Sequence, residues 1–136
     1  MIRLIILTPN GVFLDKEVER FVVPAVKGPL EISGGYTPII AALNECGVMK
    51  ITMGKPQYYA VFQGTLKVED GRAFVMCNEI EDGYSIDMAR AIASRDRALD
   101  RIQKMEEGID IKRAKASLAR AIARISAKTL DEGMEG

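Results

Sequence analysis

Histidine is absent from this chain of 136 residues, and tryptophan is absent as well. Without histidine, neither the Ser-His and Cys-His pairs of covalent catalysis nor an imidazole metal site can be assembled. The only cysteines, Cys46 and Cys77, do not form a CxxC spacing, so we expect core thiols rather than a zinc or redox motif. These absences weigh against an enzyme.

Long hydrophobic runs are also missing, since no apolar segment approaches the roughly 18 residues of a membrane helix. The apolar stretch at residues 1–7 is too short for the core of a signal peptide, and a Thr-Pro-Asn-Gly turn follows it. We therefore expect a soluble chain with no export signal and no direct insertion into a membrane.

The formal net charge of zero conceals an uneven distribution. Residues 1–85 carry a net charge of −2, residues 86–130 carry +5, and residues 131–136 form an acidic tail with three carboxylates. A modestly basic segment favours an acidic partner surface or a bound phosphate. Its charge density is too low for a nucleic-acid-binding arm, so no nucleic-acid partner is expected.

The first 84 residues alternate short β-rich runs with turn sequences, of which Asp70-Gly71 between two such runs predicts a hairpin. About eight to ten short strands at this spacing predict a β-sandwich or a flattened barrel. The expected strands are residues 2–8, 12–14, 17–23, 30–32, 39–43, 48–53, 57–62, 65–68 and 73–78.

From residue 85 the pattern becomes helical. Ser85 is a suitable N-cap, and Asp87 in the first turn would complement the helix dipole. We expect one helix from residue 86 to about 106, a stop at Gly108, and a second helix over 111–129 capped by Asp110. Two helices of similar length joined by a short loop predict an antiparallel helical hairpin at residues 85–130.

The apolar positions of this hairpin are expected to form its seam. They are Ile92, Leu99, Ile102 and Met105 in the first helix and Ile111, Ala114, Leu118, Ile122 and Ile125 in the second. Alanine is dense along both helices and buries little area, which at about 25 cal/mol per Å² yields only a few kcal/mol. Ordering the chain costs about 1.5 kcal/mol per residue. The hairpin should therefore need the sandwich or a partner, and we interpret it as a movable part.

The junction of the two halves holds the best candidate for a small-molecule site, because Glu81 and Asp87 lie near Arg90 in sequence. On the second helix, Arg120 and Arg124 share a face, and such a stripe can bind phosphate or partner carboxylates. The same residues also fit structural roles: a solvated helix face, charge compensation at a helix start and a polar loop.

Motifs along the chain resemble, in the same order, those of one known family. They are Leu-Thr-Pro-Asn-Gly at 7–11, Gly-Pro-Leu-Glu-Ile-Ser-Gly-Gly-Tyr-Thr-Pro-Ile at 28–39, Gln-Gly-Thr-Leu-Lys-Val at 63–68, Ile-Asp-Met-Ala-Arg-Ala at 86–91 and Asp-Ile-Lys-Arg-Ala at 110–114. Through them, residues 1 to about 130 resemble the epsilon subunit of bacterial F-type ATP synthase. Departures at Glu31, Gly34, Tyr36 and Thr65 affect local turns.

The resemblance implies a non-catalytic subunit of the central stalk on the cytoplasmic face of the bacterial cell membrane. It implies three partners: the gamma subunit, the membrane c-ring and the alpha/beta catalytic head. The sandwich would lie on the stalk. The hairpin would either fold against the sandwich or extend into the head, where it restrains ATP hydrolysis.

The resemblance also implies a regulatory ligand, ATP. In family members that bind ATP, the contacts fall on positions matching Glu81, Ile86, Asp87, Arg90, Ala91, Arg120 and Arg124. It suggests that the three arginines face phosphate and that Glu81 and Asp87 lie near adenine or ribose. One alternative is a free-standing ATP-sensing module, which would bind ATP without joining a large ATPase. Another is a small enzyme that uses Glu81 and Asp87 as acid and base.

Overall fold

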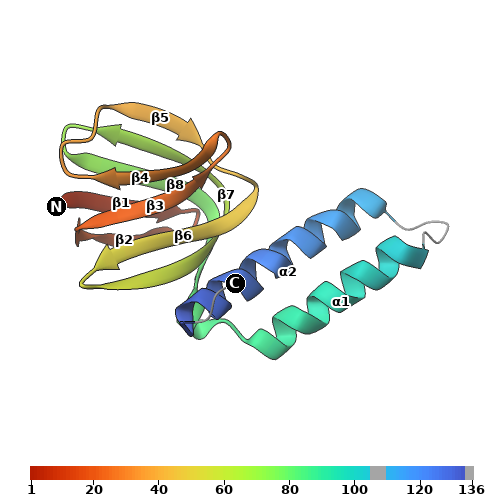
Figure 1. The fold of residues 1–136 in the computed structure, drawn as a ribbon. Helices are drawn as coiled ribbons and strands as arrows, with labels where there is room; N and C mark the ends of the chain where they lie inside the picture. Colours follow the sequence, from red (N-terminus) through yellow and green to blue (C-terminus); the bar gives the residue numbers. More distant parts are fainter. Residues whose placement is uncertain (105–109, 134–136) are drawn as a thin grey trace.

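A computed structural model of the chain describes residues 1–104 and 110–133. Eight strands are followed by a short 3-10 helix and two long α-helices (Figure 1). Their bounds are β1 Ile2–Thr8, β2 Gly11–Val18, β3 Arg20–Ala25, β4 Gly28–Ser33, β5 Ile39–Ala42, β6 Cys46–Met53, β7 Lys55–Glu69, β8 Arg72–Asp82, η1 Gly83–Ser85, α1 Met88–Lys104 and α2 Ile111–Asp131.

The strands are connected in the order β2-β1-β8-β7-β6-β3-β4, and β5 pairs with β7. The long strand β7 pairs on one edge with β6 along its first half and with β5 along its second half. Gln63, with φ of 52°, lies where β7 changes partners, just before Gly64. The bend at this position lets one strand serve both layers, which confirms the predicted sandwich.

The sandwich has its own core, built by side chains at alternating strand positions. In β1 these are Ile2, Leu4 and Ile6, all at most 2 % exposed. Phe21, Met49, Val61, Leu66 and Val75 belong to the same cluster, as does the thiol of Cys77. This cluster draws only on residues 2–80, so the core of the β-rich half contains no residue of the helices.

The predicted strand boundaries need two corrections, and one predicted turn is confirmed. The runs at 57–62 and 65–68 form the single strand β7, which continues through the irregular position at Gln63. The runs at 12–14 and 17–23 become β2, which ends at Val18, and β3, which begins at Arg20. Glu19 lies between these two strands, and its carboxylate accepts a hydrogen bond from the Gly54 amide at 2.9 Å. The Asp70-Gly71 hairpin is confirmed, with φ of 48° and 74° at these two residues.

The predicted start of the first helix is also wrong. Ser85 ends η1, whose own N-cap is Asp82, and α1 begins at Met88. The N-cap of α1 is Asp87, whose Oδ1 accepts the amide of Arg90 at 3.1 Å. Asp110 caps α2 as predicted, accepting the amide of Arg113 at 3.1 Å. Met105, Gly108, the expected helix end near 106 and the last three residues of the acidic tail lie outside the described residues.

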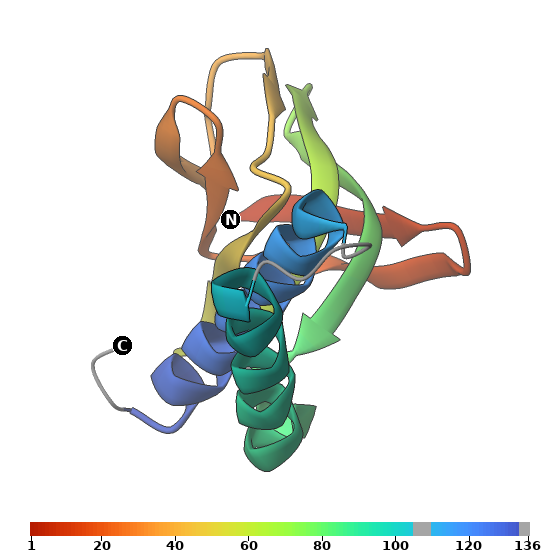
Figure 2. The same cartoon turned by 90° about the vertical axis from the view of Figure 1, so that its right-hand side faces the viewer.

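The two helices meet through alanines rather than through the larger side chains. Leu99 and Ile122, predicted for the seam, are 38 % and 48 % exposed. The buried side chains of α1 are Ala91 and Ala98, and α1 packs chiefly against α2. In turn, α2 lies on β6, β7 and η1 (Figures 1 and 2), so that α2 stands between α1 and the sandwich.

Candidate functional site

The hairpin contacts the sandwich through a second, smaller apolar cluster. It consists of Ala60, Phe62, Ile86, Ala91, Ala123 and Ala127, with Cys46, Val48 and Ile125 at its edge. Four of its six buried members are alanines, so the cluster buries little apolar area. Apolar burial alone therefore holds the hairpin weakly.

Gly83 permits a close approach between the two halves. A Cβ atom at this position would lie 2.8 Å from the carbonyl oxygen of Ala127 and 2.8 Å from that of Tyr58. Nearby, the ammonium of Lys128 donates to the carbonyl oxygen of Tyr84 at 2.8 Å. The end of α2 is thus tied to the segment that leads into α1.

Two glutamates of β8 and two arginines of α2 form an ion-pair group, which we call the interdomain cluster: Glu79, Glu81, Arg120 and Arg124. The Nε of Arg124 lies 3.0 Å from both carboxylate oxygens of Glu81, and its Nη2 lies 2.9 Å from Oε1 of Glu81. The same Nη2 lies 3.5 Å from Glu79, whose other oxygen pairs with Arg120. These charge-assisted bonds connect the sandwich directly to the hairpin.

Phe62 lies beneath the two arginines and is fully buried. The guanidinium carbon of Arg120 is 4.4 Å from the centre of the ring, and that of Arg124 is 5.0 Å away. Cations at this distance are attracted to the negative face of an aromatic ring. Phe62 therefore positions both guanidiniums toward the glutamates while covering their apolar side.

The electrostatic environment favours the charged forms of Glu79 and Arg124. Burial raises the pKa of Glu79, but the hydrogen bond and charge of Arg120, a hydrogen bond with Glu81 and the charge of Arg124 together outweigh it, so the net pKa lies below the usual value. The hydrogen bond from Arg124 to Glu81 is the main reason that the pKa of Arg124 is raised. Each charge therefore stabilises the docked arrangement of the two halves.

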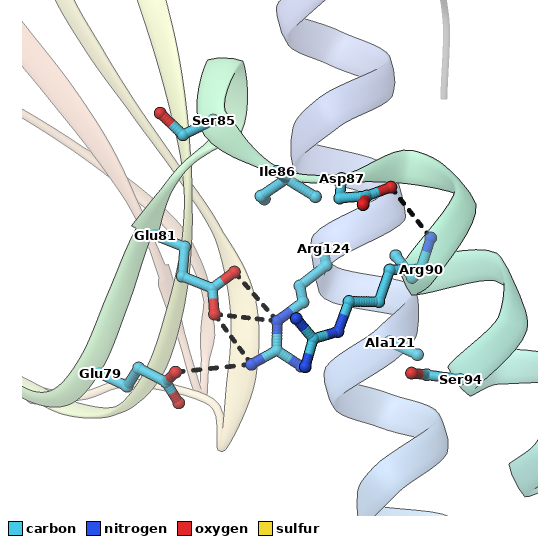
Figure 3. A pocket seen from close by; sticks show the side chains of 10 residues that line it. Glu79, Glu81, Ser85, Ile86, Asp87, Arg90, Ser94, Ala121 and Arg124 are labelled. Atoms are coloured by element: carbon cyan, nitrogen blue, oxygen red, sulfur yellow. Dashed lines mark hydrogen bonds and ion pairs between the residues drawn. The ribbon is translucent and has the colours of Figure 1, made fainter.

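A cavity of about 460 Å³ opens between β8, α1 and α2 (Figure 3). Its lining is Glu79, Glu81, Ser85, Ile86, Asp87, Arg90, Ala91, Ser94, Ala121 and Arg124. Small-molecule sites in proteins usually measure about 300–1,000 Å³. The cavity brings together six of the seven residues predicted from the sequence, and the seventh, Arg120, lies beside it in the interdomain cluster.

The polar groups of the cavity differ in whether they already have a partner within the chain. Both oxygens of Glu81 accept from Arg124, and Asp87 caps α1, so these carboxylates are not arranged as a free acid–base pair. Arg90 extends from α1 toward Arg124 and Glu81 (Figure 3), and its side chain forms no ion pair with any described residue. Arg90 is thus the cation best placed to meet a bound anion.

Sequence reasoning missed Glu79, although a signal for it exists. Residues two apart on a strand share a face, so Glu79 and Glu81 of β8 necessarily point the same way. The sequence did not show that this face of β8 meets α2, and the pairing with Arg120 and Arg124 therefore went unforeseen. Ser94 and Ala121 of the lining were missed for the same reason.

Two further findings bear on the class of protein. Among residues 1–104 and 110–133, no three His, Cys, Asp or Glu side chains gather in a way that would hold a metal ion. Neither described helix combines the length and the apolar composition needed to cross a membrane.

The division into a sandwich and a helical pair matches two family models. Residues 1–83 match the β-sandwich domain of the ATP synthase delta/epsilon chain, and residues 85–129 match the long α-helix domain of the same chain. A sandwich followed by this helical pair thus defines the class: a delta/epsilon-type chain of ATP synthase.

Curated relatives match over almost the whole chain. An ATP synthase epsilon chain of Desulfitobacterium hafniense (strain Y51) is 35 % identical, covering 90 % of this chain and 92 % of that one. The epsilon chain of Syntrophomonas wolfei is 36 % identical with 90 % coverage of each, and that of Bacillus velezensis is 35 % identical with 88 % and 91 % coverage. The chain belongs to the ATP synthase delta/epsilon family, as an epsilon chain, and is a non-catalytic subunit.

Solved structures support the fold. A chain from Euglena gracilis mitochondrial ATP synthase, in a structure of OSCP, F1 and the c-ring, has a TM-score of 0.81 at 18 % identity, covering 93 % of this chain and 80 % of that one. A chain from the central stalk and c-ring of Tetrahymena thermophila mitochondrial ATP synthase has a TM-score of 0.60 at 15 % identity, covering 93 % and 96 %.

Proposed function

We propose that this chain is a central-stalk subunit whose hairpin restrains ATP hydrolysis and responds to ATP. Its proposed partners are the gamma subunit, the c-ring and the alpha/beta catalytic head, on the cytoplasmic face of the cell membrane. The similar structures support this placement, because they come from assemblies that contain F1, the central stalk or the c-ring. Ion transport is then a property of the assembly and not of this subunit.

The observation that carries the proposal is how the hairpin is held. Its contact with the sandwich combines small apolar side chains with ion pairs that are 24–41 % exposed. Partly exposed ion pairs contribute little net stability and exchange readily for other charged partners. Carboxylates on another subunit would offer Arg120 and Arg124 the same interaction in an extended state.

The cavity supports ATP as the ligand that favours the docked form. It spans β8, α1 and α2, so it exists only while the hairpin is docked. A ligand that binds one of two states stabilises that state by RT ln(1 + [L]/Kd). We assign Arg90, Arg120 and Arg124 to the phosphates, and Glu81, Ile86, Asp87 and Ala91 to the base and ribose.

Removal of the hairpin tests the inhibitory role. A chain ending at Ser85 keeps all eight strands and the complete sandwich core. Reconstituted into the ATP synthase, it should assemble normally and increase ATP hydrolysis relative to the full-length chain in the same preparation. Unchanged hydrolysis by the assembled complex would show that the hairpin is not inhibitory.

Calorimetric titration of the isolated chain with ATP tests the ligand. Arg90→Ala and Arg120→Ala should each weaken ATP binding while the fold is retained. Arg101→Ala is the matched control, because Arg101 is an exposed arginine of α1 outside the cavity lining. If Arg90→Ala and Arg120→Ala both titrated as the native chain does, the cavity would not be the ATP site.

A further inference from the structure

We propose that Glu79 is an internal competitor of bound nucleotide, and that it sets the affinity of the cavity for polyphosphates. This inference rests on the proposed function, in which ATP occupies the cavity. Its basis is the arrangement of the interdomain cluster, where Glu79 holds the two arginines that a phosphate chain would need.

The balance of charge in the cavity disfavours a polyanion. Its lining contains three carboxylates (Glu79, Glu81 and Asp87) and two guanidiniums (Arg90 and Arg124), for a formal charge of −1. A triphosphate brought into this space meets like charges at short range, which costs free energy in a partly desolvated site. Binding becomes favourable when an arginine exchanges a protein carboxylate for a phosphate oxygen.

Of the two carboxylates on Arg124, Glu79 is the easier to displace. Its contact with Arg124 measures 3.5 Å, whereas Glu81 holds the same guanidinium through three contacts of 2.9–3.0 Å. The side chain of Glu79 is also more exposed than that of Glu81, at 41 % against 32 %. A phosphate would therefore replace Glu79 before Glu81.

Loss of the Glu79 charge should release one arginine and leave the hairpin docked. Glu79 is the only carboxylate of the described chain that pairs with Arg120. Without it, Arg120 becomes available to phosphate, while Glu81 still holds Arg124 and Phe62 still lies beneath both guanidiniums. The competitor and the main docking contact are thus separate residues.

Calorimetric ATP titration of Glu79→Gln tests the proposal. The variant keeps the shape of the side chain, removes its charge, and should bind ATP about tenfold more tightly than the native chain. Glu31→Gln is the matched control: it removes one carboxylate from β4, where Glu31 is 62 % exposed and pairs with Arg20, and should leave ATP affinity unchanged. Amide exchange of α2, recorded on the same samples, should show the hairpin still docked.

Each outcome decides between the claims. Equal or weaker ATP binding by Glu79→Gln, with weaker binding by Arg90→Ala, would overturn the role of Glu79 and leave the ATP site standing. No ATP binding by either the native chain or Glu79→Gln would overturn the ATP site together with its competitor. A fall of α2 protection in Glu79→Gln to the level of an undocked hairpin, rather than a partial fall, would also refute the inference, because Glu81 would then be insufficient to hold the hairpin.

Discussion

Substitution of Gly83 by alanine should release the hairpin while the sandwich remains folded. The added Cβ would lie 2.8 Å from two carbonyl oxygens, those of Ala127 in α2 and Tyr58 in β7. Both atoms belong to the backbone of regular elements, so neither can move aside by a side-chain rotation. The residue enters the space between the two halves and not the core of the sandwich.

The magnitude follows from the crowding. Overpacking of a close contact costs about 1–3 kcal/mol. Alanine also has less conformational entropy than glycine in the undocked segment, which favours the docked state by about 0.4–1 kcal/mol and offsets part of this cost. A net destabilisation of docking by about 1–2 kcal/mol corresponds to a factor of about 5–30 in the population of the undocked state.

Amide hydrogen exchange measures this population directly, because protection in a docked helix scales with its opening equilibrium. In Gly83→Ala, protection in α2 should fall by that factor, while protection in β1, β7 and β8 stays at the native level. Ser85→Ala, which removes an exposed hydroxyl two residues away, should change neither. Native protection of α2 in Gly83→Ala would refute the reasoning, because it would show that the two backbones are not in close contact.

Three further predictions concern the same interface. Because the pKa of Glu79 is lowered in the folded chain, the stability that charged Glu79 adds to docking is present above the usual pKa of 4.5 and is lost as the pH falls through the lowered pKa. Amide exchange of α2 should show this loss as the pH falls. An equally steep pH-dependent loss in Glu79→Gln would contradict the assignment to Glu79. Phe62→Leu should weaken docking by about 1–2 kcal/mol through the lost cation–π contacts and a small void, and α2 exchange equal to native would exclude that contribution. Burial raises the pKa of Cys77 to about 11, so its thiol should resist alkylation at pH 8. Cys46 lies at the edge of the apolar cluster between the hairpin and the sandwich, so its thiol should be alkylated faster in Gly83→Ala than in the native chain. Equal alkylation rates of Cys46 in the two chains would contradict the release of the hairpin.

Local rules were sufficient for much of the fold. The Asp70-Gly71 turn, the Asp110 cap and the change from strands to helices near residue 85 all follow from conformational preferences within a few residues. Ser85 was wrongly expected to cap α1, because Asp82 first initiates a separate 3-10 turn that uses Gly83 to Ser85. Asp82 and Ser85 are both suitable caps and lie close together in sequence, so only contacts with the rest of the chain decide which of them is used.

The candidate site was predictable in its members but not in its connections. Of the six predicted residues that the cavity brings together, Glu81, Asp87, Arg90 and Arg124 were singled out by sequence spacing, and the resemblance to known epsilon chains added Ile86 and Ala91. The pairing of Arg120 and Arg124 with β8 depends on which face of α2 meets the sandwich. Helix periodicity favoured Leu99 and Ile122 for the seam, whereas close packing selected the alanines, because small side chains let the helices approach.

The order of the helices has a consequence for how the hairpin can leave the sandwich. The outer helix, α1, packs chiefly against α2, whereas the inner helix, α2, makes the contacts with β6 and β7. The two helices should therefore leave the sandwich together, as one unit, when the contacts of α2 are broken. A reporter group placed on the outer helix would then register the same separation as one placed on the inner helix.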